Sequence, residues 1–337
     1  VGAPPDITAA PEYSVTPPRD FPDVKLAAGG VNPSVAVNPK NPNVFVAAYA
    51  AGGFCWVRTS SNAGQTWNIA KRLPMLGGKL NCDTTALFWA PDGSRVYAAY
   101  NYLIGDTFDP QEAGAFVSFS KDKGLTWSSP KIALRYPYES YRIVSLRLST
   151  PLRASDAKWV YLLSETLTPV SSHTNFTRSA DQGQTWRPAE VDLVASYYTS
   201  TTPSIAGGLG GEILVAWGEF HYDVDGPLLD RQIFVKHSNN YGATFSADIT
   251  AVPDIFGDAA VAFGSGGTAH LIYTREWYGD DFYNGKPSYV YSTKAPYTAW
   301  SQPVVLSDDI SASSYRTPAL TVSACGSGAS VLHAVWL

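Results

Sequence analysis

Ser120-Lys-Asp122-Lys-Gly124-Leu-Thr126-Trp127 is one of four copies of a short pattern in this chain. The other copies begin at Ser60, Ser179 and Ser238, so that the Asp or Asn at positions 62, 122, 181 and 240 follow one another at steps of 60, 59 and 59 residues. A regular period of this length, with strand-like runs on both sides of each copy, indicates one supersecondary unit that is repeated around a propeller or along an array.

The residue types in the pattern are those of a hairpin turn. Asp and Asn hydrogen-bond to backbone two residues on, Gly adopts a positive φ, and Ser and Thr hydroxyls satisfy the remaining backbone groups. The aromatic residue that follows is a large apolar anchor, expected to be buried. We therefore assign a structural and not a catalytic role to the turn residues Asn62, Asp122, Asp181 and Asn240 and to the anchors Trp67, Trp127, Trp186 and Phe245.

Each repeat also contains four strand-like runs. In the second repeat they are 83–89, 95–101, 113–119 and 127–134, bounded by turn signals such as Pro91-Asp-Gly93. A degraded fifth copy of the turn spans Ser292 to Trp300. First strands of six units are expected to begin near Pro33, Asp83, Arg142, Thr202, Asp258 and Thr317.

The pattern Ser-x-Asp-x-Gly-x-Thr-Trp resembles the Asp-box, or bacterial neuraminidase repeat, of sialidases and many other β-propeller proteins. This resemblance implies an all-β fold, a six-bladed β-propeller of four-stranded antiparallel blades. It says little about activity, because one fold serves many functions.

We expect two segments. Residues 1–22 contain six prolines and are predicted to form an extended arm, and residues 23–337 the propeller. The last unit has only two strand-like runs, and the segment 21–26 is similar to the fourth-strand segments that begin at Trp127 and Trp300. The N-terminal segment is therefore expected to add a strand to the last blade and cover its edge.

Composition favours a secreted or cell-surface protein. The net charge is −5 and Lys and Arg form no cluster, which argues against binding to nucleic acid or anionic membranes. No apolar run approaches the roughly 20 residues of a membrane-inserted helix. Cys55 and Cys82 lie in successive repeats and are predicted to form a disulfide. Cys325 then has no predicted partner within the chain. The spacing of Cys and His predicts no zinc site.

Polar aromatic residues gather in the loops opposite the repeated turns, which predicts that this face binds a glycan, because flat rings stack on sugars and charged groups bind hydroxyls or carboxylates. These loops carry the candidate binding residues Arg142, Tyr198, Arg275 and Trp277. The same loops could instead contact a protein partner or a second copy of the chain. Asp223-Val-Asp225-Gly226 is similar to a calcium loop but lacks its later ligands, and we predict no other cofactor.

Compared with the sialidase motifs, the chain departs in three places. Val31-Asn-Pro-Ser34 replaces the arginine motif of the first blade, Ala50-Ala-Gly-Gly53 replaces the loop with the acid Asp, and Asp258 stands where an Arg is expected. Tyr315 matches the position of the family's tyrosine nucleophile and is followed by Arg316. The resemblance therefore does not predict the sialidase mechanism.

Two other kinds of carbohydrate chemistry stay open. A glycoside hydrolase uses two carboxylates, and the candidates at loop ends are Glu165, Glu219, Asp258 and Glu276. A uronate lyase would use an arginine with Tyr and His for proton transfer, and Arg142, Tyr198 and His221 offer those groups.

First strands of a propeller line its central channel, so we expect two arginines, two aspartates and a threonine to meet there, with Tyr198 and Tyr315 nearby. The set is Asp83, Arg142, Thr202, Asp258 and Arg316. It could bind an anionic sugar, or its charges could pair and close the channel. The sequence thus predicts a carbohydrate-recognising propeller, with a non-catalytic structural or interaction module as the alternative, and leaves open whether the protein is an enzyme.

Overall fold

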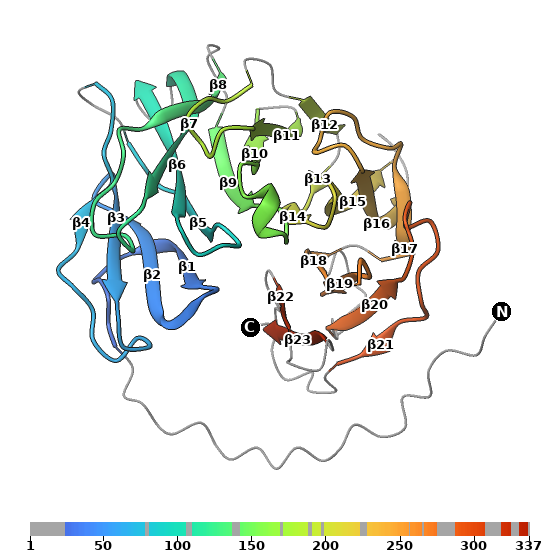
Figure 1. Cartoon of the computed structure of the whole chain (residues 1–337). Helices are drawn as coiled ribbons and strands as arrows, with labels where there is room; N and C mark the ends of the chain where they lie inside the picture. Colours follow the sequence, from blue (N-terminus) through green and yellow to red (C-terminus); the bar gives the residue numbers. More distant parts are fainter. Residues whose placement is uncertain are drawn as a thin grey trace.

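Six antiparallel sheets follow one another along the chain in the computed structural model (Figure 1). The structure describes residues 24–77, 81–105, 110–136, 142–168, 171–187, 191–196, 199–222, 228–255, 257–264, 266–274, 287–306, 318–324 and 330–335. Figure 1 shows the sheets arranged in chain order around a common centre, as in a β-propeller. In the described parts of the chain, no helix is long and apolar enough to cross a membrane.

Each of the first three sheets has four strands that pair in chain order. The first sheet contains β1 (Val31–Asn38), β2 (Asn41–Ala51), β3 (Phe54–Ser60) and β4 (Lys71–Arg72). The second contains β5 (Thr85–Trp89), β6 (Val96–Gly105), β7 (Pro110–Ser120) and β8 (Lys131–Tyr136). The third contains β9 (Arg142–Ser149), β10 (Val160–Leu167), β11 (Ser172–Ser179) and β12 (Val191–Ser196), with a 3-10 turn at Ala154–Asp156.

The remaining sheets vary this plan. The fourth has β13 (Thr199–Ser200) and β14 (Ser204–Gly207), both paired with β15 (Ile213–Tyr222), then β16 (Leu228–Ser238) and β17 (Ile249–Pro253). The fifth contains β18 (Ala259–Phe263), β19 (Ala269–Tyr273), β20 (Ser288–Ser292) and β21 (Val304–Val305). The sixth contains β22 (Ala319–Ala324) and β23 (Ser330–Val335).

The first strands of neighbouring sheets lie side by side and are linked by serine hydroxyls. The backbone N–H of Leu87 in β5 donates to Ser34 Oγ in β1 (2.9 Å), and that of Gly207 in β14 donates to Ser149 Oγ in β9 (2.9 Å). The N–H of Val261 in β18 donates to Ser204 Oγ in β14 (3.2 Å). These bonds satisfy edge groups of the inner strands and fix each sheet against the next.

Apolar cores fill the spaces between successive sheets. One cluster lies between the first and second sheets, and others lie between the second and third, the third and fourth, and the fourth and fifth. Trp217 and Tyr161, both fully buried, belong to the cluster between the third and fourth sheets. Successive side chains of β10 point to opposite sides of its sheet. Leu162 therefore packs toward the second sheet and Leu163 toward the fourth.

The repeated pattern forms the turn between the third and fourth strands of its sheet. In the second copy, Ser120 Oγ accepts from the N–H of Gly124 (2.8 Å) and donates to Asp122 Oδ1 (2.7 Å). Asp122 Oδ1 also accepts from the N–H of Thr126 (2.8 Å), and the Thr126 hydroxyl donates to Oδ2 (2.5 Å). The copies that begin at Ser60, Ser179 and Ser238 make the matching bonds.

The glycines of the second, third and fourth turns, Gly124, Gly183 and Gly242, pack against the preceding sheet. A Cβ at Gly124 would lie 2.7 Å from Thr59 of the first sheet, and one at Gly242 would lie 2.5 Å from the Phe176 ring of the third. Both glycines have a positive φ, +85° and +74°. Position and backbone conformation together therefore require glycine there.

Two details differ from the sequence-based expectation. The fourth strand of the second sheet begins at Lys131 and not at Trp127, because the Trp127 indole N–H bonds to the carbonyl of Gly124 (3.1 Å) and keeps this residue in the turn. The rings of Trp67, Trp127 and Trp186, and that of Phe245, are half-buried, not fully buried. In the degraded copy, Trp300 makes the same kind of bond to Tyr297 (2.8 Å).

The predicted pairing of the N-terminal segment with the last sheet falls largely outside the described residues. Residues 1–23 lie outside the described residues, and residues 24–26 form no strand. Leu26 and Ala27 line an apolar hollow together with Tyr49 and Trp67. Closure of the last sheet by the N-terminal segment therefore stays a prediction.

Replacing the turn aspartates by asparagine should keep the fold and reduce its acid sensitivity. Burial alone would raise the pKa of Asp122, but hydrogen bonds from Thr126 and Ser120 outweigh it and lower the pKa to about 2. The pKa of Asp181 is lowered in the same way. These carboxylates therefore stabilise the fold above pH 4, and the contribution is lost as the pH falls from about 4 to 2. Asn62 and Asn240 show that asparagine fits the turn.

We expect Asp122→Asn/Asp181→Asn to lose less unfolding free energy than the wild type between pH 5 and pH 2 in urea denaturation. The control is Asp92→Asn, in a different hairpin. Equal losses in wild type and double variant would contradict the assigned role.

A pair of glycine variants separates backbone strain from close packing. Gly64→Ala places Cβ no closer than 3.6 Å to Phe45, so it should cost only the strain of a positive φ, about 1 kcal/mol. Gly242→Ala adds a clash with the Phe176 ring and should cost roughly 1–3 kcal/mol more. Equal unfolding free energies for the two variants would show that the turns do not lock one sheet onto the next.

Candidate functional site

The site is built at the ends of the sheets opposite the repeated turns, which we call the loop face. Strands of an antiparallel sheet alternate in direction, so first strands begin at this face and second strands end there. Glu165 lies near the end of β10, and Asp258 directly precedes β18. Thr202 lies two residues before β14. The topology therefore brings residues from the third, fourth and fifth sheets to one end of the molecule.

Pairing within the third sheet places Arg147 beside Glu165. Glu165 pairs with Ser145 of β9, and Leu163 pairs with Arg147. Residues that pair directly point to the same face of a sheet, as do residues two apart in one strand. Arg147 and Glu165 are therefore diagonal neighbours on the face of the third sheet that packs against the fourth.

The charged groups of this cluster are shielded from water. Glu165 is 7% exposed and Asp258 is 6% exposed. Burial raises the pKa of Glu165 to about 7, and the nearby Asp258 adds to the rise, while Arg147 and a hydrogen bond from Thr202 oppose it. Burial lowers the pKa of the Arg147 guanidinium, and Asp258 and Glu165 oppose that shift. Glu165 is thus a carboxyl group that carries a proton in part of the molecules at neutral pH.

Buried hydroxyls surround the two carboxylates. Ser145 and Thr174 are the partners of Glu165 in the strands on either side, and the N–H of Thr274 donates to the carbonyl of Asp258 (3.0 Å). Within the described parts of the chain, these three hydroxyls are buried and make no hydrogen bond. Such groups are uncommon in folded proteins. They can donate to, or accept from, a polar ligand that enters the cluster.

Glu219 lies at the same interface between sheets. It follows Val215 and Trp217 on one face of β15, and both pack in the cluster between the third and fourth sheets. The Trp217 indole N–H donates to Glu219 Oε2 (3.1 Å), and the side chain is half-buried. Glu219 is therefore a third carboxylate at this end of the interface.

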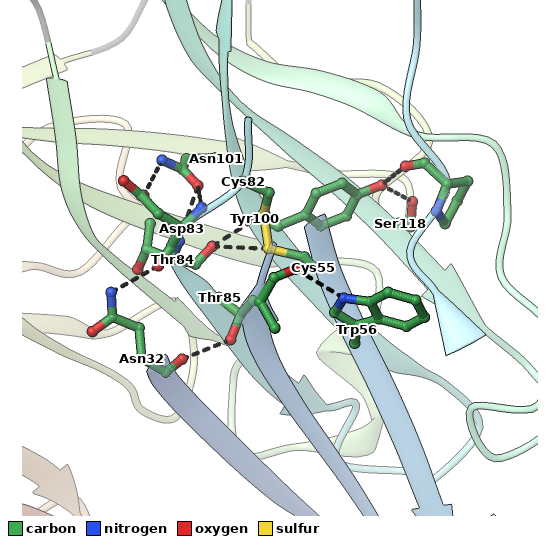
Figure 2. Close-up of a disulfide and its surroundings, with 12 residues drawn as sticks. Asn32, Cys55, Trp56, Cys82, Asp83, Thr84, Thr85, Tyr100, Asn101 and Ser118 are labelled. Atoms are coloured by element: carbon green, nitrogen blue, oxygen red, sulfur yellow. Dashed lines mark hydrogen bonds between the residues drawn. A yellow bond between two sulfur atoms is a disulfide. The ribbon is translucent and has the colours of Figure 1, made fainter. Parts of the chain in front are cut away.

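Figure 2 shows the disulfide that connects the first two sheets, with Asp83 beside it. Asp83 forms a second charged pair, with Arg142. Cys55 of β3 and Cys82 have Cα atoms 5.5 Å apart. The next residue, Asp83, accepts from Asn101 Nδ2 at Oδ1 (2.5 Å) and from Arg142 at Oδ2 (3.4 Å). The side chains of Arg142 and Asp83 are 55% and 43% exposed, so this pair adds little to stability.

The structure brings together only part of the predicted axial set. Asp83 pairs with Arg142, whereas Thr202 and Asp258 belong to the cluster around Glu165. His221 lies on β15, and its side chain is outside the described residues. The other candidates that fall outside them are Tyr198, Arg275, Trp277, Tyr315, Arg316, Glu276, Cys325 and the segment 223–226. The described residues contain no group of three or more His, Cys, Asp or Glu that could hold a metal.

Sequence reasoning missed Arg147. A signal for it exists: this arginine interrupts the apolar run of β9 between Leu146 and Leu148. A charge inside a strand that is otherwise buried requires a charged partner. Its partners could not be identified from sequence, because Glu165 lies on a neighbouring strand and Asp258 comes from the fifth sheet.

No protein-family model matches this sequence, and no curated protein matches it. Solved structures with the same fold include a Hadza microbial sialidase (14% identity, TM-score 0.53, 86% of this chain and 60% of that one). Others are the NanB sialidase of Streptococcus pneumoniae (11%, 0.56, 87% and 63%) and an α-L-arabinofuranosidase of Fusarium graminearum in complex with arabinobiose (12%, 0.54, 91% and 92%).

These likenesses establish the fold alone. The chain spans less than two thirds of the length of the two sialidases, and the sequence identity is low in every case. The all-β propeller predicted from the repeat is thereby confirmed.

Glu165→Gln should remove a pH dependence of stability. Because the pKa of Glu165 is raised in the folded state, its contribution is most favourable below pH 4.5 and is lost as the pH rises through about 7. The loss is on the order of 2–3 kcal/mol in the wild type. In denaturant unfolding at pH 5 and pH 8, the variant should show a smaller difference than the wild type. Glu112→Gln, whose carboxylate pairs with Arg135 on the second sheet (2.7 Å), is the control. An unchanged difference in Glu165→Gln would contradict the assignment.

Proposed function

We propose that this protein is a carbohydrate-active propeller, a glycoside hydrolase with Glu165 as general acid and Asp258 as the second carboxylate. The observation that carries the proposal is the raised pKa of Glu165, about 7, next to another buried carboxylate at the loop face. Cleavage of a glycosidic bond uses two carboxyl groups, one as the acid and the other as the base or nucleophile. Their different environments determine which group has which role. The sialidase and arabinofuranosidase structures with the same fold support a carbohydrate substrate.

The chemistry follows from the protonation states. Protonated Glu165 donates its proton to the glycosidic oxygen as the bond to the anomeric carbon breaks. Asp258 then either attacks that carbon or activates a water, and the positive charge of Arg147 limits repulsion between the two carboxylates. The unpaired hydroxyls of Ser145 and Thr174 offer hydrogen bonds to sugar hydroxyls.

One observation favours the non-catalytic alternative. Arg147 lies among Glu165 and Asp258, and Arg142 pairs with Asp83, so the charges of the loop face partly neutralise one another. Such pairing could close the centre of a structural or interaction module. A glycan that binds without being cleaved, or no glycan binding at all, would support that reading.

We also propose a location and a domain plan. The Cys55–Cys82 disulfide favours an oxidising compartment, in line with a secreted or cell-surface protein. The six sheets correspond to six blades of an Asp-box propeller, with residues 1–22 as an arm. Limited proteolysis followed by mass spectrometry tests this plan, since the propeller should resist cleavage as one unit.

The proposal is tested by a screen of sialosides, arabinosides, neutral glycosides and uronate polymers. For any substrate that is cleaved, Glu165→Gln should lower kcat by roughly 10²–10⁴-fold, because it removes the transferable proton. Circular dichroism and thermal unfolding should show the variant folded. Glu112→Gln should retain full activity. A cleaved substrate whose turnover is unchanged in Glu165→Gln would contradict the role of Glu165.

A further inference from the structure

A second polar cluster lies on the third sheet, at the hairpin that joins β10 and β11. Ser171 Oγ lies 2.9 Å from His173 Nε2, and His173 Nδ1 lies 3.0 Å from Asp192 Oδ2. Ser171 directly precedes β11, His173 is its second residue, and Asp192 comes from the neighbouring strand β12. A serine, a histidine and an aspartate thus form one continuous chain of hydrogen bonds.

The register between β11 and β12 explains how this series of hydrogen bonds forms. Asp192 pairs with Asn175, which lies two residues after His173 and points to the same face of the sheet. His173 and Asp192 are therefore diagonal cross-strand neighbours. Thr166 pairs with His173, while Thr174 pairs with Glu165. The cluster consequently lies on the opposite face of the third sheet from Glu165, and it does not depend on the function proposed above.

The proton positions follow from the chemistry of the partners. An ionised carboxylate only accepts hydrogen bonds, so Nδ1 of His173 carries the proton that is donated to Asp192. Nε2 is then the acceptor for the Ser171 hydroxyl. This is the tautomer in which an imidazole can remove the proton of a serine that attacks a carbonyl.

The cluster is accessible, and Thr168 positions Ser171. The His173 side chain is 22% exposed and that of Asp192 is 42% exposed. The Thr168 hydroxyl lies 2.7 Å from Ser171 Oγ and accepts from the N–H of Ser171 (3.0 Å). The same hydroxyl donates to the carbonyl of Ser171 (3.2 Å) and so helps to hold Ser171 beside His173.

We propose that Ser171 is the nucleophile of a second active site, which transfers the acyl group of a small carboxylic ester to water. Ser171 Oγ bonds to the ester carbonyl carbon while its proton moves to His173 Nε2. The C–O bond to the alcohol breaks, and His173 returns the proton to that leaving oxygen. Water then attacks the acyl-serine with His173 as base, which releases the carboxylic acid and restores the Ser171 hydroxyl.

The experiment uses the full chain, a fluorophosphonate that labels activated serines, and p-nitrophenyl acetate as the ester. Peptide mass spectrometry should place the label on Ser171, and Ser171→Ala should abolish it. His173→Gln should lower the labelling rate by roughly 100-fold or more, because the general base is lost. Asp192→Asn should lower it as well and alter its pH profile, an effect that a purely structural role would not produce.

Ser94→Ala is the matched control. Ser94 lies at the tip of the β5–β6 hairpin, and its hydroxyl donates to Asp92 Oδ1 (2.7 Å) without a histidine. This variant should be labelled and should hydrolyse p-nitrophenyl acetate like the wild type. Thermal unfolding should show that each variant is folded. Folded wild type with no label on Ser171, or an unchanged labelling rate in His173→Gln, would overturn the proposal, whatever the glycan screen shows.

Discussion

The hydrogen bonds of the repeated turn are the constraint on which the rest of the fold depends. One serine hydroxyl accepts from the glycine N–H and donates to the Asp or Asn two residues on, which closes the turn within eight residues. The closed turn places its glycine directly against the sheet before it, as Gly242 lies against Phe176. Every turn thus sets the hairpin geometry of its own sheet, and the second, third and fourth turns also set the packing of that sheet on the one before it.

The fixed packing of the sheets determines which residues come together at the loop face. Serine hydroxyls also link β1 to β5, β9 to β14 and β14 to β18. These bonds fix the positions of the first strands relative to one another. Glu165 and Asp258, from different sheets, can then be buried close together without the freedom to move apart. Burying two carboxylates and one guanidinium is costly. The pKa of Glu165 is raised because burial disfavours its charged form. Strongly shifted pKa values of this kind are concentrated at functional sites.

Much of the fold could be predicted from the sequence, because its signals are local. The turn pattern and the alternating runs indicated an all-β propeller, and the expected start of β9 at Arg142 agrees with the structure. The expected start of the fourth strand at Trp127 was wrong, because the indole hydrogen bond to Gly124 holds that residue in the turn. Sequence spacing could not show that bond.

The candidate site was only partly predictable for a related reason. Glu165 and Asp258 were among the candidate carboxylates, but their proximity to Arg147 depends on strand register and on the packing of three sheets. The link between His173 and Asp192 likewise depends on a register shift between β11 and β12. Such long-range pairings leave no pattern in a single sequence.

The site proposed at the loop face depends on Glu165 being a buried carboxyl group next to a second carboxylate. The most direct test is a 13C NMR titration of the glutamate side-chain carboxyl signals, with Glu165 assigned as the signal that is absent from Glu165→Gln. We expect a titration midpoint near pH 7 for this signal. A midpoint near pH 4, as for an exposed glutamate, would contradict it.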